Sequence, residues 1–311
     1  MSASLSVRVS EARMLTPLVR EFTLEPCVGS LPGFSPGSHI QVHLPLAERN
    51  LRNAYSLTNA STQNHNYRIA VRLQEASRGG SRYLHQQVRV GDTLSISPPA
   101  NLFALHSTAN LHILIAAGIG ITPFMAYIEA LEKRDANFEL HYLFRPGLTD
   151  AYLNDLQQRL GSRLHCYDAS RRLHLPTILG GRPLGSHVYT CGPQRLLADV
   201  QEYAKALGWP ASRVHHEAFS APQPGNPFEL QLLRSGRRLT VGADQSLLEA
   251  LEDAGLDVPN LCRGGVCGQC VTRHVSGDVE HRDHFLNCTE QAEFLMPCVS
   301  RGCGPRVVLD L

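Results

Sequence analysis

The 311-residue sequence lacks a long apolar run, and no stretch approaches the roughly 18 uninterrupted apolar residues that a membrane-spanning helix requires. Its opening segment, MSASLSVRVSEARML, also lacks the apolar core of a signal peptide and soon alternates as a strand does. These absences predict a soluble, cytoplasmic protein with no membrane partner. With 43% hydrophobic and 18% charged residues, the whole chain is expected to be globular, and its length suits two or three domains.

The sequence also lacks a strong charge of either sign. Its 29 basic and 28 acidic residues give a net charge of +1, which predicts no nucleic-acid partner. The balance is uneven, because residues 228–311 hold twelve acidic and eight basic residues, which leaves +5 for the remainder. A basic N-terminal part suits anionic cofactors, and an acidic C-terminal part suits docking on a basic partner. Chance explains so small an imbalance equally well.

No internal repeat or low-complexity tract is present, but the local pattern changes along the chain. Short alternating runs separated by Gly and Pro predict an antiparallel β-barrel over residues 1–104. Strands that alternate with helices predict an open parallel α/β domain over 105–219. A Pro- and Gly-rich linker, SAPQPGNP, covers 220–227, and residues 228–311 read as a third, small domain. The predicted fold class is therefore multidomain, α/β and β.

The cysteines are concentrated near the end of the chain. An odd total of nine, without a secretion signal, favours thiolate chemistry over a disulfide framework. Three of them stand in C-x4-C-x2-C spacing with glycines between, and a fourth follows in the context Met-Pro-Cys, as in plant-type [2Fe–2S] ferredoxins. Paired C-x2-C zinc knuckles fit this spacing less well. The predicted metal ligands are Cys262, Cys267, Cys270 and Cys298, and the leftover Cys288 and Cys303 are expected to be buried thiols.

Two glycine turns follow predicted strands of the middle region. In ILIAAGIGITPF, an apolar strand leads through Gly118 and Gly120 into a helix, an arrangement whose backbone N–H groups suit a pyrophosphate. In YTCGP, Cys191 and Gly192 also follow a strand. Open α/β sheets bind ligands at the carboxyl ends of their strands, so both turns are candidate nucleotide contacts. The alternatives are a tight structural turn and, for Cys191, a small buried residue.

Together with these motifs, the segments AYSL, RGGS, SPPANLF and HEAF stand in an order that resembles the phthalate dioxygenase reductase and vanillate O-demethylase reductase family. The resemblance covers essentially the whole chain. It implies an FMN-binding barrel, an NADH-binding domain and a C-terminal plant-type ferredoxin with the β-grasp fold.

The resemblance also implies roles for individual residues. Tyr55 and Ser56, which follow Ala54, are expected against the flavin, and Ala70 and Val71 on the strand beside its ring. The FMN phosphate is expected at Gly79, Gly80 and Ser81. Thr122 is expected near flavin and nicotinamide, Cys191 near the nicotinamide C4, and Phe219 over one of the two rings. The remaining implied nucleotide contacts are Gly118, Gly120, Gly192 and Pro193.

One position departs from the family pattern. The family usually has an arginine two places before the tyrosine, in contact with the flavin phosphate, but this chain has Asn53 there and Arg52 one place earlier. A shift of one residue in a strand reverses the side-chain direction. Either the backbone adjusts, or Arg72, Arg78 or Arg82 serves the phosphate, and Arg52 is then an exposed charge.

NADH is the expected donor because Asp168 follows a predicted strand, where a carboxylate can bond the ribose and repel a 2′-phosphate. The arginines of Ser170-Arg171-Arg172 leave NADPH open as the alternative.

A nicotinamide gives up two electrons as hydride and a ferredoxin cluster takes one, so a flavin must stand between them. The chain lacks a Rieske C-x-H…C-x2-H pattern and a mononuclear-iron site. The resemblance therefore implies a separate Rieske-type oxygenase as electron acceptor. Two alternatives stay open: an FAD-containing reductase for another oxygenase or a haem enzyme, and an iron–sulfur electron carrier without flavin chemistry.

Overall fold

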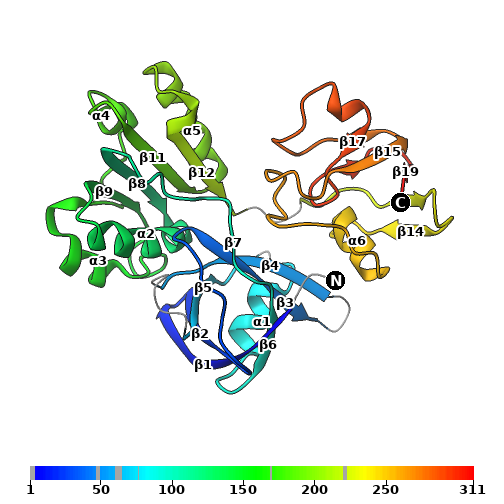
Figure 1. The fold of residues 1–311 in the computed structure, drawn as a ribbon, viewed down its shortest axis with the longest axis horizontal. Helices are drawn as coiled ribbons and strands as arrows, with labels where there is room; N and C mark the ends of the chain where they lie inside the picture. Colours follow the sequence, from blue (N-terminus) through cyan, green and yellow to red (C-terminus); the bar gives the residue numbers. More distant parts are fainter. Residues whose placement is uncertain (1–3, 47–49, 60–64, 76, 169, 220–222) are drawn as a thin grey trace. The chain divides into compact units, whose positions relative to one another are not determined.

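The computed structural model describes residues 4–46, 50–59, 65–75, 77–168, 170–219 and 223–311 (Figure 1). The described chain divides into two compact units, an N-terminal unit that ends at Phe219 and a C-terminal unit that holds residues 223–311. Within the described ranges, no helix combines the length and apolar character needed to cross a membrane. The boundaries at residues 104, 219 and 228 remain predictions.

The first sheet of the N-terminal unit is a closed barrel. Its strands follow the order β4-β3-β6-β1-β2-β5, and β7 pairs with β3. A bridge between Leu57, just beyond β4, and Ile69 of β5 joins the two ends, so neither end strand is left as an open edge. The strands are β1 (Leu5–Thr16), β2 (Val19–Pro26), β3 (Ser38–Pro45), β4 (Asn50–Ser56), β5 (Tyr67–Arg72), β6 (Thr93–Ile96) and β7 (Ala100–Asn101).

A short helix, α1 (Gly80–Gln86), interrupts the strands of this region, where the sequence pattern predicted strands alone. Gly79 has φ of 111°, a value that side chains strongly disfavour, and this glycine turns the chain into the helix. Ser81 and Leu84 are buried three residues apart, which is helical spacing and too short a run to stand out in the sequence.

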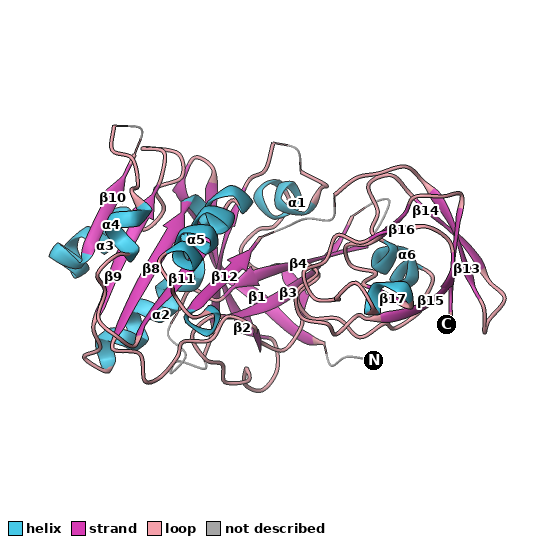
Figure 2. Cartoon of the chain, turned by 90° about the horizontal axis from the view of Figure 1, so that it is seen from above, coloured by secondary structure: helices cyan, strands magenta, loops and turns pink. Residues whose placement is uncertain are grey.

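The second sheet of the N-terminal unit is parallel throughout, in the order β10-β9-β8-β11-β12. Figure 2 shows these five strands side by side. One buried cluster joins α2 and α3 to one face, and another joins α4 and α5 to the opposite face, so the sheet is wound on both sides. The elements are β8 (Leu111–Ala117), η1 (Gly118–Ile121), α2 (Thr122–Lys133), β9 (Phe138–Leu143), α3 (Leu153–Leu160), η2 (Gly161–Arg163), β10 (Leu164–Tyr167), α4 (Leu175–Leu179), β11 (Ser186–Gly192), α5 (Gln194–Ala206), η3 (Ala211–Arg213) and β12 (Val214–Ala218).

The C-terminal unit is a mixed sheet in the order β14-β13-β19-β15-β17, with a separate pair β16-β18 and one α-helix, α6. Ser246 begins α6 with a capping box, since its side chain bonds the Glu249 amide and Glu249 bonds back. Cys270 and Cys298 belong to the core beneath this helix. The elements are β13 (Phe228–Leu232), β14 (Arg238–Val241), α6 (Leu247–Asp253), β15 (Thr272–Ser276), β16 (Val279–Glu280), η4 (Glu290–Ala292), β17 (Phe294–Leu295), β18 (Arg301–Gly302) and β19 (Arg306–Leu309).

Candidate functional site

The strand β4 directs Asn53 and Tyr55 to the same side, and the Asn53 amide donates to the Tyr55 hydroxyl at 3.2 Å. Asn53 also lies against Gly80 at the start of α1, because a Cβ on Gly80 would stand 2.3 Å from the Asn53 Nδ2. Strand alternation turns Arg52 to the opposite side. Asn53 therefore borders the predicted phosphate segment, at the position where the family usually has arginine.

The predicted phosphate segment is a polar turn that leads into α1. The Ser77 hydroxyl accepts from the Gly79 amide at 3.1 Å and from the Ser81 hydroxyl at 3.0 Å. Arg72, at the end of β5, has a buried Nε that bonds no described residue. An unsatisfied guanidinium nitrogen near such a turn suits a phosphate oxygen. The residues present thus fit a flavin phosphate, with Arg72 the best-supported of the three alternative arginines.

The two glycine turns of the parallel sheet meet at one point. A Cβ on Gly120 would stand 2.2 Å from the Cys191 carbonyl oxygen, so only glycine allows η1 to pack on the end of β11. Thr122 is buried beside this contact and donates to the Ile119 carbonyl at 2.9 Å. The fold thus brings together a set of predicted nucleotide residues at the carboxyl ends of the strands: Gly118, Gly120, Thr122, Cys191, Gly192 and Pro193.

Glu217 is a further site residue that sequence reasoning did not single out, although it stands in the HEAF motif. It pairs in register with Cys191 across β11 and β12. Burial raises the pKa of Glu217 to about 8, against the smaller opposing effect of the nearby Ser56 hydroxyl. Burial and the charge of Glu217 raise the pKa of the Cys191 thiol. Ser56 of the barrel therefore lies near Glu217 of the parallel sheet, and the raised pKa favours the protonated carboxyl at neutral pH.

Two other predicted residues lie at strand ends. Phe219 follows β12 and is 46% exposed, so its place over a ring remains a prediction. Asp168 follows β10 and accepts from the Ser170 amide at 2.8 Å and from its hydroxyl at 2.5 Å. These two bonds lower the pKa of Asp168. The guanidinium of Arg171 lies 5.2 Å from the centre of the Tyr167 ring. Arg171 is one of the two arginines that could instead bind the 2′-phosphate of NADPH, and it already contacts this ring.

The four predicted cluster ligands form two close pairs in the C-terminal unit. The Cys270 and Cys298 sulfurs are 3.3 Å apart, too far for a disulfide and near the roughly 3.7 Å between two sulfurs that share one tetrahedral metal. The Cys262 sulfur accepts from the Gly264 amide at 3.3 Å. Closely placed thiols and an amide aimed at sulfur are what an iron–sulfur cluster requires, so the residues fit it.

An ion pair between Arg263 and Glu252 attaches the loop that carries three of these cysteines to helix α6. Arg263 adopts the left-handed φ of 51°, and its guanidinium bonds both carboxylate oxygens of Glu252 on α6 at 2.8 Å. The expectation that Cys288 and Cys303 are buried is wrong, since both are exposed. They stand in turns outside the sheet core, where a cysteine in sequence gives no sign of its exposure.

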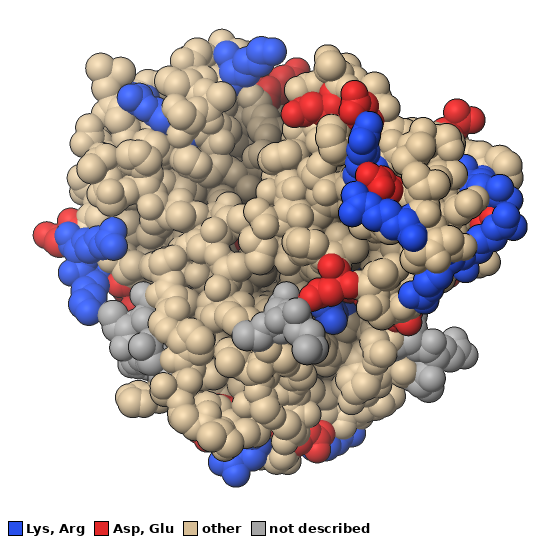
Figure 3. All heavy atoms as spheres, turned by 45° about the vertical axis from the view of Figure 1, so that its right-hand side comes forward, with Lys and Arg blue, Asp and Glu red and all other residues tan. Residues whose placement is uncertain are grey.

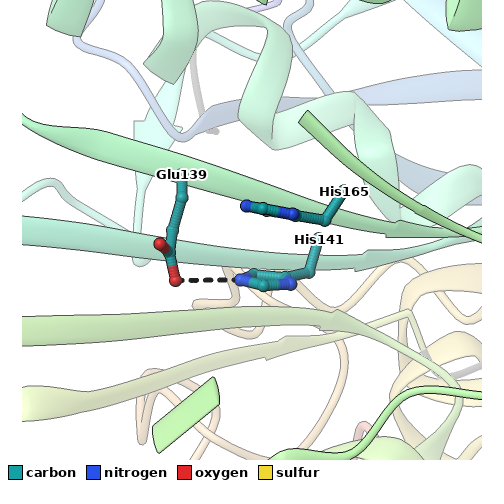
Figure 4. Close-up of side chains that lie close together, drawn as sticks. All are labelled: Glu139, His141 and His165. Atoms are coloured by element: carbon teal, nitrogen blue, oxygen red, sulfur yellow. Dashed lines mark hydrogen bonds and ion pairs between the residues drawn. The ribbon is translucent and has the colours of Figure 1, made fainter. Parts of the chain in front are cut away.

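Glu139, His141 and His165 are close enough together to raise the question of a metal site (Figure 4). Both ring nitrogens of His141 are engaged, Nε2 with Glu139 and Nδ1 with the Tyr167 hydroxyl, each at 2.9 Å. The His141 and His165 rings stack with planes 15° apart, whereas ligand lone pairs in the ring planes would have to converge. Arg182 also pairs with Glu139. This group is therefore a hydrogen-bonded ion-pair network.

One face of the molecule shows how the charged side chains are distributed. On the face drawn in Figure 3, the acidic and basic side chains of the described residues lie in small mixed groups among uncharged ones. The predicted acidic docking surface stays a prediction.

Comparison with known families supports this three-part arrangement. Residues 7–104 match the oxidoreductase FAD-binding domain, and residues 230–303 match the 2Fe-2S iron-sulfur cluster binding domain. Residues 94–214 match the N-terminal domain of dimethylamine monooxygenase subunit DmmA-like proteins.

Full-length relatives share the whole arrangement. The chain is 61% identical to the heme-dependent oxidative N-demethylase beta subunit of Ectopseudomonas mendocina over 100% of both chains. It is 41% identical to the carnitine monooxygenase reductase subunit of Escherichia coli over 98% of both, and 37% identical to the vanillate O-demethylase oxidoreductase of Acinetobacter baylyi over 99% of both. A solved phthalate dioxygenase reductase superposes with a TM-score of 0.88 at 32% identity, covering 99% of this chain and 98% of that one.

A flavin-type barrel, a parallel nucleotide-type sheet and a ferredoxin unit in one chain define an iron–sulfur flavoprotein oxidoreductase. The chain belongs to the phthalate dioxygenase reductase-like family of oxygenase reductases, as the sequence motifs predicted. The predicted fold class is thereby confirmed.

Replacing Cys298 with serine tests the fourth ligand. We expect Cys298→Ser to lose the visible absorption and most of the iron of the cluster, because the buried sulfur beside Cys270 is removed. Exposed Cys288→Ser is the matched control and should keep both. Iron and sulfide analysis after anaerobic purification measures the difference, and a fully loaded Cys298→Ser protein would contradict the assignment.

The raised pKa of Glu217 predicts a pH dependence of stability. In the folded state the carboxyl binds a proton up to about pH 8, but in the unfolded state only up to about 4.5, so folding stability falls as pH rises through 8. Between pH 6.5 and 8 the loss is about 1.5 kcal/mol. Urea unfolding of the flavin-free protein should show this loss, and Glu217→Gln should flatten it. If the free energy of unfolding fell equally steeply with pH in both proteins, the raised pKa of Glu217 would be refuted.

Proposed function

We propose that this protein takes hydride from NADH at an FMN bound on the barrel and delivers single electrons, through its own [2Fe–2S] cluster, to a separate oxygenase component. The observation that supports the proposal is that Ser56 of the flavin-type barrel lies near Glu217, the register partner of Cys191 in the nucleotide-type sheet. A bound flavin supplies the conversion between a two-electron donor and a one-electron acceptor.

In this proposal, the residues of the chain bind the flavin, orient its ring towards the nicotinamide and exclude water from the space between them. Asn53, Gly79, Gly80, Ser81 and Arg72 border the proposed phosphate site. FMN fits this short cradle, and FAD is the alternative that the name of the matching barrel family keeps open.

Three side chains at the proposed site of the flavin and nicotinamide rings, Cys191, Glu217 and Tyr55, are expected to be uncharged at neutral pH. Burial keeps Cys191 a thiol and leaves Glu217 protonated at neutral pH, so neither places a negative charge where hydride arrives. In Tyr55, burial raises the pKa to about 12, which keeps its phenol neutral as well.

For the acceptor, we propose a haem-dependent oxidative N-demethylase component. The supporting observation is the 61% identity, over full length, to the beta subunit of such an enzyme, against 41% and 37% for the carnitine monooxygenase and vanillate O-demethylase reductases. The match of residues 94–214 to a dimethylamine monooxygenase subunit family points to the same class. The second candidate is the Rieske-type oxygenase that the sequence resemblance implied.

The deciding experiment uses the full chain purified anaerobically. We expect released FMN, two irons and two sulfides per chain, and rapid bleaching by NADH. The reduced protein is then mixed with the catalytic component of the E. mendocina demethylase or with a Rieske-type vanillate O-demethylase oxygenase. Faster electron delivery to the haem component supports the proposal, and faster delivery to the Rieske component overturns it. FAD would correct the cofactor, and a cluster without flavin would refute the reductase role.

Asp168 should set the choice of coenzyme. Its carboxylate, held ionised by Ser170, is positioned to bond a ribose hydroxyl and to repel a 2′-phosphate. We expect Asp168→Ala to lower kcat/KM for NADH about tenfold and to raise it for NADPH. Asp155→Ala, on α3, is a control that should leave the ratio unchanged. An unaltered NADH-to-NADPH ratio in Asp168→Ala would contradict this role.

A further inference from the structure

A buried ion-pair and hydrogen-bond group connects the barrel with the parallel sheet, away from the residues already discussed. Glu21, on β2, is 2% exposed although it is a carboxylate. Its Oε1 accepts from the Arg13 Nε at 2.8 Å, and its Oε2 accepts from the Tyr152 hydroxyl at 2.6 Å. Both oxygens are thus engaged, one by a neighbouring barrel strand and one by the nucleotide-type sheet.

Tyr152 is held in an unusual conformation to make this bond. Its φ of 63° lies in the left-handed region, which bulky side chains disfavour, and it stands just before α3. Burial and the charge of Glu21 raise the pKa of Tyr152 well above its ordinary value, so the phenol keeps the proton that it donates. Backbone strain of this kind persists only where surrounding contacts fix it.

The loop 145–152 that ends at Tyr152 is fastened at several further points. The Tyr142 hydroxyl of β9 donates to the carbonyls of Thr149 and Ala151 at 2.9 and 3.1 Å. The Leu148 carbonyl accepts from Thr16, at the end of β1, at 2.7 Å. The loop is therefore bonded to its own sheet on one side and to the barrel on the other.

The same loop touches the segments expected to carry the two reacting rings. Ala151 packs with Val19 and Ala70, and Tyr152 and Ile119 pack against this cluster. Ala70 pairs directly with Glu21 across β2 and β5, and it lies on the strand predicted to run beside the flavin. Ile119 lies in η1, the predicted nucleotide turn. The Glu21–Tyr152 bond thus ties β2, the neighbour of the proposed flavin strand, to a loop that packs against the proposed nucleotide turn.

We propose that Tyr152 and Glu21 are positioning residues that fix the distance between the flavin strand and the nicotinamide turn. This inference rests on the proposed function. Hydride transfer needs the reacting atoms about 3–3.5 Å apart, and a displacement near 1 Å costs about a hundredfold in rate. A buried, fully engaged carboxylate is suited to this task, because any separation of barrel and sheet leaves its Oε2 without the Tyr152 donor while Arg13 still holds its Oε1.

The test follows NADH-driven flavin bleaching in the full-length holoprotein by anaerobic stopped flow. Tyr152→Phe removes only the hydroxyl, and we expect bleaching slowed about 10- to 100-fold with the NADH dissociation constant within about threefold. Glu21→Leu removes the acceptor of the Tyr152 hydroxyl and should slow bleaching to a similar extent. Tyr203→Phe, at an exposed position on α5, is the matched control and should behave as wild type.

A second readout does not depend on turnover. In the flavin-free protein, hydrogen exchange at amides of 118–121 and 145–152 should quicken in Tyr152→Phe and remain unchanged in β13, which belongs to the C-terminal unit. If Tyr152→Phe does not fold, Thr16→Val removes the Leu148 bond at the other end of the loop and should give the same slowing.

The outcomes separate the two proposals. A wild-type protein that NADH does not bleach contradicts the proposed function. A wild-type protein that bleaches normally, with Tyr152→Phe or, where that variant does not fold, Thr16→Val bleaching within about twofold of it, overturns the positioning role alone. A rise in the NADH dissociation constant with an unchanged limiting rate overturns it too, because that result indicates a binding contact.

Discussion

The contact between η1 and the end of β11 is the constraint on which the site depends. Gly120 carries no side chain, so the turn can rest on the Cys191 carbonyl, where a Cβ would stand 2.2 Å away. This contact brings the two glycine turns of the parallel sheet to one point. Cys191 is in turn the register partner of Glu217, which lies near Ser56 of the barrel. A side chain at position 120 would therefore displace the nucleotide turn from the end of β11.

The C-terminal unit likewise depends on a tightly turned loop. Three cysteines stand on a loop that needs left-handed backbone at Gly265, Gly268 and Arg263. Glycine adopts that conformation at little cost, but Arg263 does so against its own preference and is held by Glu252 on α6. Because α6 itself begins with a capping box at Ser246, local helix chemistry supports the loop on which the metal ligands stand.

The sequence was informative where chemistry depends on residue spacing and uninformative where it depends on packing. The cysteine spacing, the two glycine turns and the alternation of strands and helices predicted the three parts of the fold. Helix α1 was missed because its buried residues span too few positions to show a period. Glu217 and Glu21 were missed for another reason: a glutamate on a strand gives no sign of burial until its tertiary neighbours are known. The direction of Asn53 likewise required the backbone.

Two glutamates of the N-terminal unit, the buried Glu21 and the half-buried Glu217, illustrate how environment assigns different tasks to one residue type. Glu21 has donors on both oxygens, Arg13 and Tyr152, so its charge is matched within the structure and its bonds hold two segments together. The Oε2 of Glu217 bonds no described residue, and burial raises the pKa of this carboxyl to about 8. A carboxyl that is poorly satisfied and close to neutral in charge is suited to gain or lose a proton, whereas one that is fully paired is suited to fix geometry. Their environments therefore suit Glu217 to a change of protonation near pH 8 and suit Glu21 to hold the loop 145–152 against the barrel.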